Sequence, residues 1–246
     1  MLNDLAEAAA AIAALRSGAR GSLRAGGVTG SVPRFLAPAI GALHGTHPGV
    51  RVYALVNTSE GLVAALRRGE LDVALAPRPP DDDLDGIDTR PLGDEPLTVV
   101  ARAAHPCAHH RRVELASLNR ATWIVPPAGG PLRRDFDALH ASANLRPPAD
   151  LIETVSIVAT LALLQGSDAL SLLPEGLARH YETPGMIARL AVPLPGAGTR
   201  YEIMTRANRP LAPAADAFVA VLAAMASRHD PGRGVPARRP GRATRR

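Results

Sequence analysis

Residues 22–76 alternate between segments typical of β-strands and segments typical of helices, and this alternation restricts the fold more than any other feature of the chain. We expect strands at residues 22–27, 50–56 and 71–76. The helix between the first two strands holds Pro33 in its first turn, and the next helix follows the possible caps Asn57 to Glu60. Three strands joined by two helices predict a parallel sheet with right-handed crossovers.

The second half of the chain repeats this pattern less clearly. The expected strands are residues 87–92, 97–101, 122–125, 151–153, 169–173, 186–192 and 201–206, and the expected helices are residues 131–143, 156–165, 174–180 and 214–226. These segments predict an α/β protein with two lobes, whose last segments return to the first lobe. We place lobe 1 at residues 21–103 plus 201–228 and lobe 2 at residues 104–200, with a cleft for a small ligand between them.

The basic residues are concentrated at one end of the chain. All 28 are arginine, and residues 229–246 hold six of them against one aspartate, a net charge of 6 − 1 = +5. The remaining residues hold 22 arginines and 22 acidic residues, so the body of the protein is neutral. Residues 229–246 have little apolar surface to bury and are predicted to be disordered. This tail is either a nucleic-acid-binding arm or an unselected, solvated segment.

Cysteine content and hydropathy indicate the compartment. Cys107 is the single cysteine, which excludes an internal disulfide and suits a reducing cytosol. No apolar run approaches the roughly 18 residues that span a bilayer. The Ala-rich segment at residues 5–15 lacks a preceding basic segment, so it does not resemble a signal peptide. We therefore expect a cytoplasmic protein without a membrane anchor.

The sequence patterns of enzymes and metal sites are missing. Residues 26–30 do not have the glycine spacing of a dinucleotide-binding loop, and the chain has no Walker loop, nucleophile elbow or His-Glu-x-x-His motif. Residues 105–110 hold three histidines and Cys107, but no distant cysteine completes a zinc site. The aspartates at residues 81–85 indicate an exposed acidic loop. We expect no catalytic residue, no cofactor and no metal.

Several short motifs occur in an order and spacing that resemble the effector-binding domain of LysR-type transcriptional regulators. The most recognisable is Leu66-Arg67-Arg68-Gly69-Glu70-Leu71-Asp72-Val73-Ala74, and it is flanked by Gly21-Ser22-Leu23-Arg24, His47-Pro48-Gly49-Val50, Glu95-Pro96-Leu97-Thr98-Val99-Val100 and Arg209-Pro210-Leu211. The resemblance covers residues 2–226. The runs at residues 126–133 and 153–164 are most similar to the galactose-binding-protein-regulator branch of that family.

This resemblance implies a two-lobed, type 2 periplasmic-binding-protein-like fold that senses a small organic effector, such as a sugar, a sugar acid or another carboxylate. It also implies a homodimer or a tetramer. Residues 1–20 look like the end of the linker and dimerisation helix, so we expect the N-terminal winged helix-turn-helix, through which such proteins bind DNA, to be absent from this chain. The alternatives are a solute-binding protein for transport or an enzyme built on the same fold.

The candidate ligand-binding residues lie where helices are expected to begin, because free amide groups there attract carboxylates and hydroxyls. The resemblance implies that the first two of these loops, and the corresponding part of lobe 2, face the effector. The residues are Thr29, Gly30 and Ser31 after the first strand, Thr58 and Ser59 after the second, Pro127 and Gly129 in a Pro/Gly-rich loop, and Thr154 and Ser156 before an apolar helix. Simple helix capping, or a plain turn for Pro127 and Gly129, is the alternative at each position. Arg133 and Arg134 follow at a helix start and either meet an anionic partner or are solvated.

Overall fold

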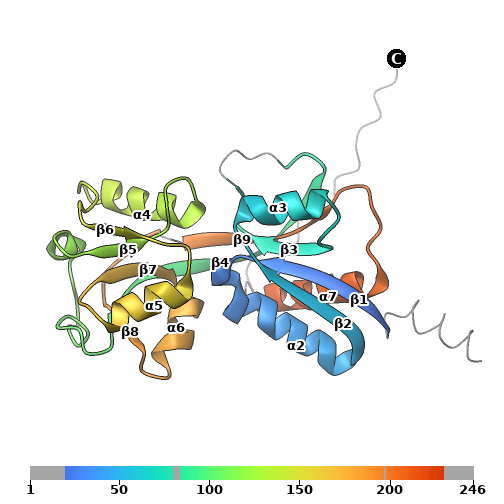
Figure 1. The fold of residues 1–246 in the computed structure, drawn as a ribbon, viewed down its shortest axis with the longest axis horizontal. Helices are drawn as coiled ribbons and strands as arrows, with labels where there is room; N and C mark the ends of the chain where they lie inside the picture. Colours follow the sequence, from blue (N-terminus) through green and yellow to red (C-terminus); the bar gives the residue numbers. More distant parts are fainter. Residues whose placement is uncertain (1–19, 80–83, 197, 230–246) are drawn as a thin grey trace, which may run out of the picture.

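A computed structural model of the protein describes residues 20–79, 84–196 and 198–229. The strands of these residues form one mixed sheet in the order β2-β1-β3-β9-β4-β7-β5-β6, with β8 paired to β4. The strands are β1 (Arg20–Gly27), β2 (Gly49–Val56), β3 (Val73–Ala76), β4 (Ile87–Arg102), β5 (Trp123–Val125), β6 (Leu151–Glu153), β7 (Leu170–Pro174), β8 (Ile187–Arg189) and β9 (Gly198–Arg206). Figure 1 shows that the sheet is divided into two lobes, with β4 and β9 running side by side between them.

In lobe 1, β1 lies between β2 and β3 and is parallel to both, as the alternating pattern predicts. One face of this sheet is covered by α2 (Ala37–Thr46) and α7 (Pro213–His229), and the other by α3 (Ser59–Arg67). The chain enters α2 through a short 3-10 turn, η1 (Thr29–Ser31), and a π-helical turn, η2 (Val32–Leu36). The side chain of Thr58 caps α3 by accepting the amide N–H of Gly61 at 3.2 Å. Leu62, Val63 and Leu66 bury its inner face.

In lobe 2, β5 is parallel to β6 and β7, whereas β4 runs antiparallel to β7 and β8. One face packs against η3 (Leu115–Leu118) and α4 (Pro131–Ser142), where Trp123 and Phe136 meet with ring centroids 5.2 Å apart. The other face packs against α5 (Ile157–Gln165) and α6 (Glu175–Glu182). Each lobe therefore has helices on both faces of its part of the sheet, the arrangement of a doubly wound α/β fold.

Two predicted strands prove to be one. The sequence predicts separate strands at residues 87–92 and 97–101, because Gly93 and Pro96 lie between them, but β4 continues through both. The register with β9 shifts between Pro91 and Gly93, and a bulge of this kind accommodates a proline without ending the strand. The prediction of a strand over residues 186–192 is also wrong in extent, since β8 pairs with β4 only at Ile187–Arg189.

Some of the predicted segments lie outside the residues that the structure describes. The expected linker helix at residues 1–20 falls outside them except for Arg20, as does the acidic loop at residues 81–83 and the basic tail beyond His229. Within the described ranges, no helix is long and apolar enough to cross a membrane. The limits of the two lobes at residues 21–103 plus 201–228 and 104–200 stay a prediction.

Candidate functional site

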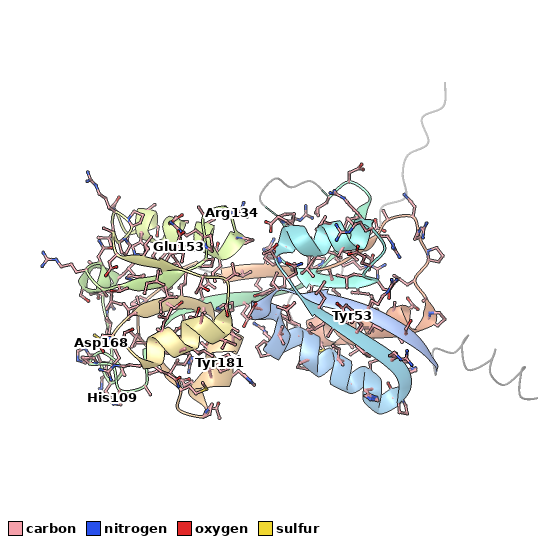
Figure 2. The ribbon with its side chains drawn as sticks, viewed as in Figure 1. Tyr53, His109, Arg134, Glu153, Asp168 and Tyr181 are labelled. Atoms are coloured by element: carbon pink, nitrogen blue, oxygen red, sulfur yellow. The ribbon has the colours of Figure 1, made fainter. Side chains whose placement is uncertain are left out.

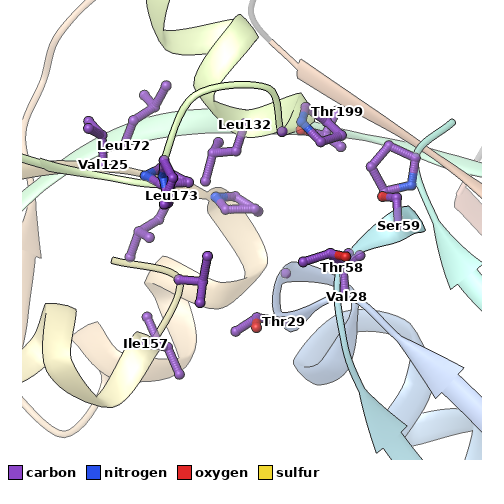
Figure 3. Close-up of a pocket in the computed structure, with 18 of the residues that line it drawn as sticks. Val28, Thr29, Thr58, Ser59, Val125, Leu132, Ile157, Leu172, Leu173 and Thr199 are labelled. Atoms are coloured by element: carbon purple, nitrogen blue, oxygen red, sulfur yellow. The ribbon is translucent and has the colours of Figure 1, made fainter. Parts of the chain in front are cut away.

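A cavity of about 650 Å³ lies between the two lobes. Residues from η1 and the start of α3 line it on one side, residues from β5, β7 and the starts of α4 and α5 line it on the other, and Thr199 and Tyr201 of β9 lie between. The close-up in Figure 3 shows Thr29, Thr58 and Ser59 facing Leu132, Ile157 and Leu173 across this space. Cavities of this size at a junction between lobes are where proteins hold small organic ligands.

The lobe 1 wall carries hydrogen-bonding groups. Thr58 caps the Gly61 amide. The amides of Ser59 and Glu60 have no partner inside the helix, since the first amides of an α-helix have no carbonyl four residues earlier within it. The side chain of Ser59 is only 2% exposed, and its Oγ is buried without a hydrogen-bond partner among the described residues. A buried hydroxyl without a partner among the protein's own groups is unfavourable, so Ser59 Oγ is a candidate donor to a ligand in the cavity.

The lobe 2 wall is aliphatic. Its lining is formed by the carboxyl ends of β5 and β7, the first turns of α4 and α5, and one residue of α6. The aliphatic side chains are Ile124, Val125, Leu132, Ile157, Leu172, Leu173 and, from α6, Leu177. Two hydroxyls on this side donate to carbonyls of the protein, Ser171 Oγ to Ile124 at 2.7 Å and Thr160 Oγ1 to Ser156 at 3.1 Å, while Thr154 Oγ1 accepts the amide of Ser156 at 3.1 Å. This wall therefore offers mainly aliphatic contact area, and its polar groups are the Thr154 hydroxyl and the backbone amides at the starts of α4 and α5.

Strand β9 closes the cavity between the lobes. Thr199 Oγ1 donates to Asp135 Oδ2 at 3.3 Å, and burial raises the pKa of this carboxyl above its ordinary value. Burial, with a smaller contribution from Glu95, raises the pKa of Tyr201, so its phenol stays neutral at physiological pH. A Cβ at Gly30 would overlap the Tyr201 hydroxyl and would lie 2.7 Å from the Pro174 ring. Gly30 therefore allows the two lobes to approach each other beside the cavity.

The cavity contains little charge. Of the lining residues in the described part of the chain, Glu60 alone is ionisable at neutral pH. Arg133 does not line the cavity: its guanidinium bonds to Glu153 at 2.7 Å, to Asp137 at 3.2 Å and to the Pro126 carbonyl at 3.2 Å. Glu153 and Asp137 are thus the anionic partners of Arg133, and they offset the unfavourable position of a cation in the first turn of a helix. Arg134 is exposed (Figure 2). By holding the Pro126 carbonyl, Arg133 fixes the loop that precedes α4.

The structure brings most of the candidate ligand-binding residues together. Those that line the cavity are Thr29, Gly30, Thr58, Ser59, Pro127, Gly129 and Thr154. Ser31 does not, because its Oγ is turned inward to donate to the Val28 carbonyl at 2.8 Å. Ser156 does not line it either, because its Oγ caps α5 by accepting the amide of Ala159 at 3.3 Å. The capping alternative describes the side chain of Ser156, and also that of Thr58, whereas Ser31 bonds to a carbonyl and caps no helix.

Sequence reasoning missed the aliphatic wall and the two β9 residues. Val125 is the last residue of β5 and Leu173 the next-to-last residue of β7, and an apolar residue near a strand end has the same sequence signature as the core residues before it. The position of these two residues near the carboxyl ends of their strands could have identified them as lining residues, because ligands bind beyond the carboxyl ends of parallel strands. No metal cluster appears: within the described ranges, no three His, Cys, Asp or Glu side chains converge. His105 instead accepts the amide of Cys107 at Nδ1, 3.1 Å away.

Two lobes joined by paired strands, with a cavity that both lobes line, make up the type 2 periplasmic-binding-protein-like fold. The chain belongs to the LysR family, since residues 16–227 match the description "LysR substrate binding domain". The fold and the family predicted from the sequence motifs are thereby confirmed.

Known proteins similar to this chain are transcriptional regulators. The HTH-type transcriptional regulator GbpR of Azospirillum brasilense is 30% identical over 225 residues, which are 91% of this chain and 66% of that protein. The HTH-type transcriptional regulator GalR of Pseudomonas putida is 29% identical over 221 residues, 90% of this chain and 55% of that protein. This chain thus spans roughly half to two thirds of their length. The name GbpR agrees with the predicted branch of the family.

Among solved structures, the effector binding domain of QuiR in complex with shikimate has a TM-score of 0.70 at 18% identity. The similarity covers 85% of this chain and 99% of that chain. At this identity the similarity establishes the shared fold.

Proposed function

We propose that this chain is the sensing domain of a LysR-type transcriptional regulator and that a small organic effector binds in the cavity between the lobes. The observation that carries the proposal is that residues of both lobes and of β9 line a single cavity of about 650 Å³. The fold shared with an effector binding domain that holds shikimate supports it. The names of the relatives favour regulation over transport or catalysis.

A ligand in this cavity changes the protein by its different affinity for different lobe orientations. An arrangement in which both walls contact the ligand is stabilised, and β4 and β9 carry the change in lobe orientation. In our proposal the sensing domain acts on transcription through a winged helix-turn-helix outside this chain, in a cytoplasmic homodimer or tetramer, and it catalyses no reaction.

Thermal unfolding with a panel of sugars, sugar acids, other carboxylates and phosphate esters tests whether this cavity binds a ligand. A true ligand at about 100 times its Kd stabilises the folded state by about 2.7 kcal/mol, which raises Tm by a few degrees. In Thr29→Tyr the new ring occupies the cavity and the rise in Tm should vanish. Thr46→Tyr places the same ring on the exposed end of α2 and should leave the rise intact. A rise that persists in Thr29→Tyr would place the ligand elsewhere and contradict the proposal.

A further inference from the structure

The two walls of the cavity differ in chemistry, and this difference narrows the class of ligand. Donor groups that lack a partner gather on the lobe 1 side, at Ser59 Oγ and the first amides of α3. The lobe 2 side presents mainly aliphatic side chains; the hydroxyls of Ser171 and Thr160 are bonded to carbonyls of the protein, and the Thr154 hydroxyl accepts the amide of Ser156. A ligand that satisfies both walls has one polar end and one apolar end.

The start of α3 is suited to a single carboxylate. The helix has nine residues, its dipole favours negative charge at this end, and its first amides point out of the helix. The Ser59 hydroxyl is buried beside them without a partner and lines the cavity. A carboxylate oxygen that accepts from Ser59 Oγ and from an amide of this turn supplies both missing partners.

The absence of a cation limits the charge of the ligand. Lysine is missing from the sequence, and the described residues that line the cavity include no arginine or histidine. Phosphate esters and dicarboxylates bring a second negative charge, for which the described lining residues supply no counter-charge. One carboxylate is within what a helix start and a hydroxyl stabilise, whereas a second buried anionic charge is not.

The apolar character continues at the edges of the cavity. Val56, at the end of β2, is 52% exposed, and Val155, just before α5, is 68% exposed; both line the cavity and belong to opposite lobes. Large aliphatic side chains this exposed are unfavourable in water, and a ligand with an apolar body covers them. A sugar or sugar acid, with a hydroxyl on most of its carbons, leaves its hydroxyls unpaired against the lobe 2 wall.

We propose that the ligand of this cavity is an amphipathic monocarboxylic acid. Its compact ring or chain of hydrocarbon packs on the lobe 2 wall, and its one carboxylate binds Ser59 and the first turn of α3. This inference rests on the proposed function of the cavity and narrows it from carboxylates and sugars in general to one class. Sugars, sugar acids and phosphorylated compounds become the ligands that the cavity rejects.

Calorimetric titration of the protein with matched compounds tests this class. The probes are cyclohexanecarboxylate, benzoate, phenylacetate and octanoate, the alcohol corresponding to each, galactose, galactonate and 2-phosphoglycolate. At least one monocarboxylate should bind roughly tenfold or more tightly than its own alcohol, because a charge-assisted hydrogen bond is lost in the alcohol. The same acid should bind more tightly than galactose, galactonate and the phosphate ester.

Two pairs of variants locate the ends of the bound acid. Ser59→Ala should weaken it roughly tenfold and leave its alcohol little changed, whereas Ser31→Ala, a buried serine outside the lining, should not alter either. Val155→Thr should weaken the acid roughly threefold, because it places a hydroxyl against the apolar body. Val158→Thr is the matched control, since Val158, three residues later in the first turn of α5, is 74% exposed and lies outside the lining.

The outcomes separate this inference from the proposed function. Tighter binding of galactose, galactonate or 2-phosphoglycolate, lost in Thr29→Tyr, overturns the monocarboxylate class and leaves the sensing function standing. Binding of a monocarboxylate that Ser59→Ala does not weaken overturns the assignment of the head group. If no compound of any class binds, both the class and the sensing function are contradicted.

Discussion

The carboxylate of Glu95 accepts a hydrogen bond from the backbone amide of Gly176 at 2.5 Å. Glu95 lies on β4 between the lobes and is fully buried, and Gly176 belongs to the first turn of α6 in lobe 2. The second oxygen of Glu95 has no hydrogen-bond partner among the described residues and lies 3.9 Å from Nη1 of Arg34, in η2 of lobe 1. One carboxylate therefore bridges a helix of each lobe.

Glu95→Gln should reduce the pH dependence of stability. Burial raises the pKa of Glu95, and the Gly176 hydrogen bond and Arg34 lower it by less. The folded protein then binds this proton more tightly than the unfolded chain, so the free energy of unfolding falls as pH rises from the ordinary carboxyl pKa through the folded-state pKa. Glutamine keeps an oxygen for the Gly176 amide but does not titrate. Urea denaturation at intervals between about pH 4 and pH 8 measures the slope.

Two neighbouring carboxyls define the controls for this measurement. Burial also raises the pKa of Asp135, so part of the slope should remain in Glu95→Gln. The hydrogen bond from Arg68 lowers the pKa of exposed Glu70, which gives a contribution of opposite sign, and Glu70→Gln should not flatten the slope. An unchanged slope in Glu95→Gln would show that Glu95 is already ionised freely in the folded protein.

Gly30→Ala should destabilise the protein and disturb how its lobes approach. The added methyl group would overlap the Tyr201 hydroxyl and the Pro174 ring, and both residues are well packed, so we expect a loss of about 1–3 kcal/mol in the free energy of unfolding. Gly41→Ala, on α2 where a Cβ meets no atom within 4 Å, should instead gain about 0.5–1 kcal/mol. Denaturant unfolding of the pair measures the difference. Equal stability of the two variants would mean that the lobes separate beside Gly30 without cost.

Ser59→Ala should cost almost nothing in the absence of ligand, within about 0.5 kcal/mol of the wild type, because its buried Oγ has no partner to lose. Ser31→Ala removes the hydrogen bond to the Val28 carbonyl and should cost about 1 kcal/mol. Chemical denaturation of both variants without any added compound measures the contrast. A loss at Ser59 as large as that at Ser31 would reveal a partner in the empty protein.

Arg133→Gln should loosen the loop at residues 126–130, because the guanidinium alone joins the Pro126 carbonyl to Glu153 and Asp137. Its side chain is only 14% exposed, so we expect a loss of about 1–2 kcal/mol in stability. Exposed Arg134→Gln should change stability by less than about 0.5 kcal/mol. Hydrogen exchange at the amides of Ala128 to Gly130 should be faster in Arg133→Gln alone, and equal rates in the two variants would show that another contact holds the loop.

The fold was predictable because each local signal agreed with the next. Leu71 to Ala76 is an apolar run that fits a buried strand, and Thr58 and Gly69 stand at the two ends of the helix before it. The continuity of β4 was not predictable in this way. Pro91, Gly93 and Pro96 are each typical of a break, and only the pairing with β9, more than 100 residues later in the chain, keeps this segment extended.

The hydroxyl-bearing half of the site was predictable from position, but the direction of each side chain was not. Ser31, Ser59 and Ser156 all stand at helix starts, and yet only Ser59 faces the cavity. Ser31 ends a 3-10 turn, which turns its hydroxyl back to the Val28 carbonyl, and Ser156 is the cap of its helix rather than the residue after it. Thr58 shows that a cap residue can also line the cavity, so the direction of each hydroxyl depends on the local backbone geometry, which sequence periodicity does not resolve.

The position of β9 in the middle of the sheet sets the order in which the protein is completed during synthesis. Lobe 1 consists of the first and last parts of the chain, and in its sheet β9 alone joins β3 to β4. During translation, β3 therefore has one unpaired edge until β9, which ends at residue 206, has been synthesised. Helix α7, which packs on β1, is synthesised later still. The strands and helices of lobe 2 lie within one continuous stretch, so we expect them to assemble first. We therefore expect the lobe 2 wall of the cavity to form during translation before the sheet that supports the hydroxyl-bearing wall of lobe 1 is complete.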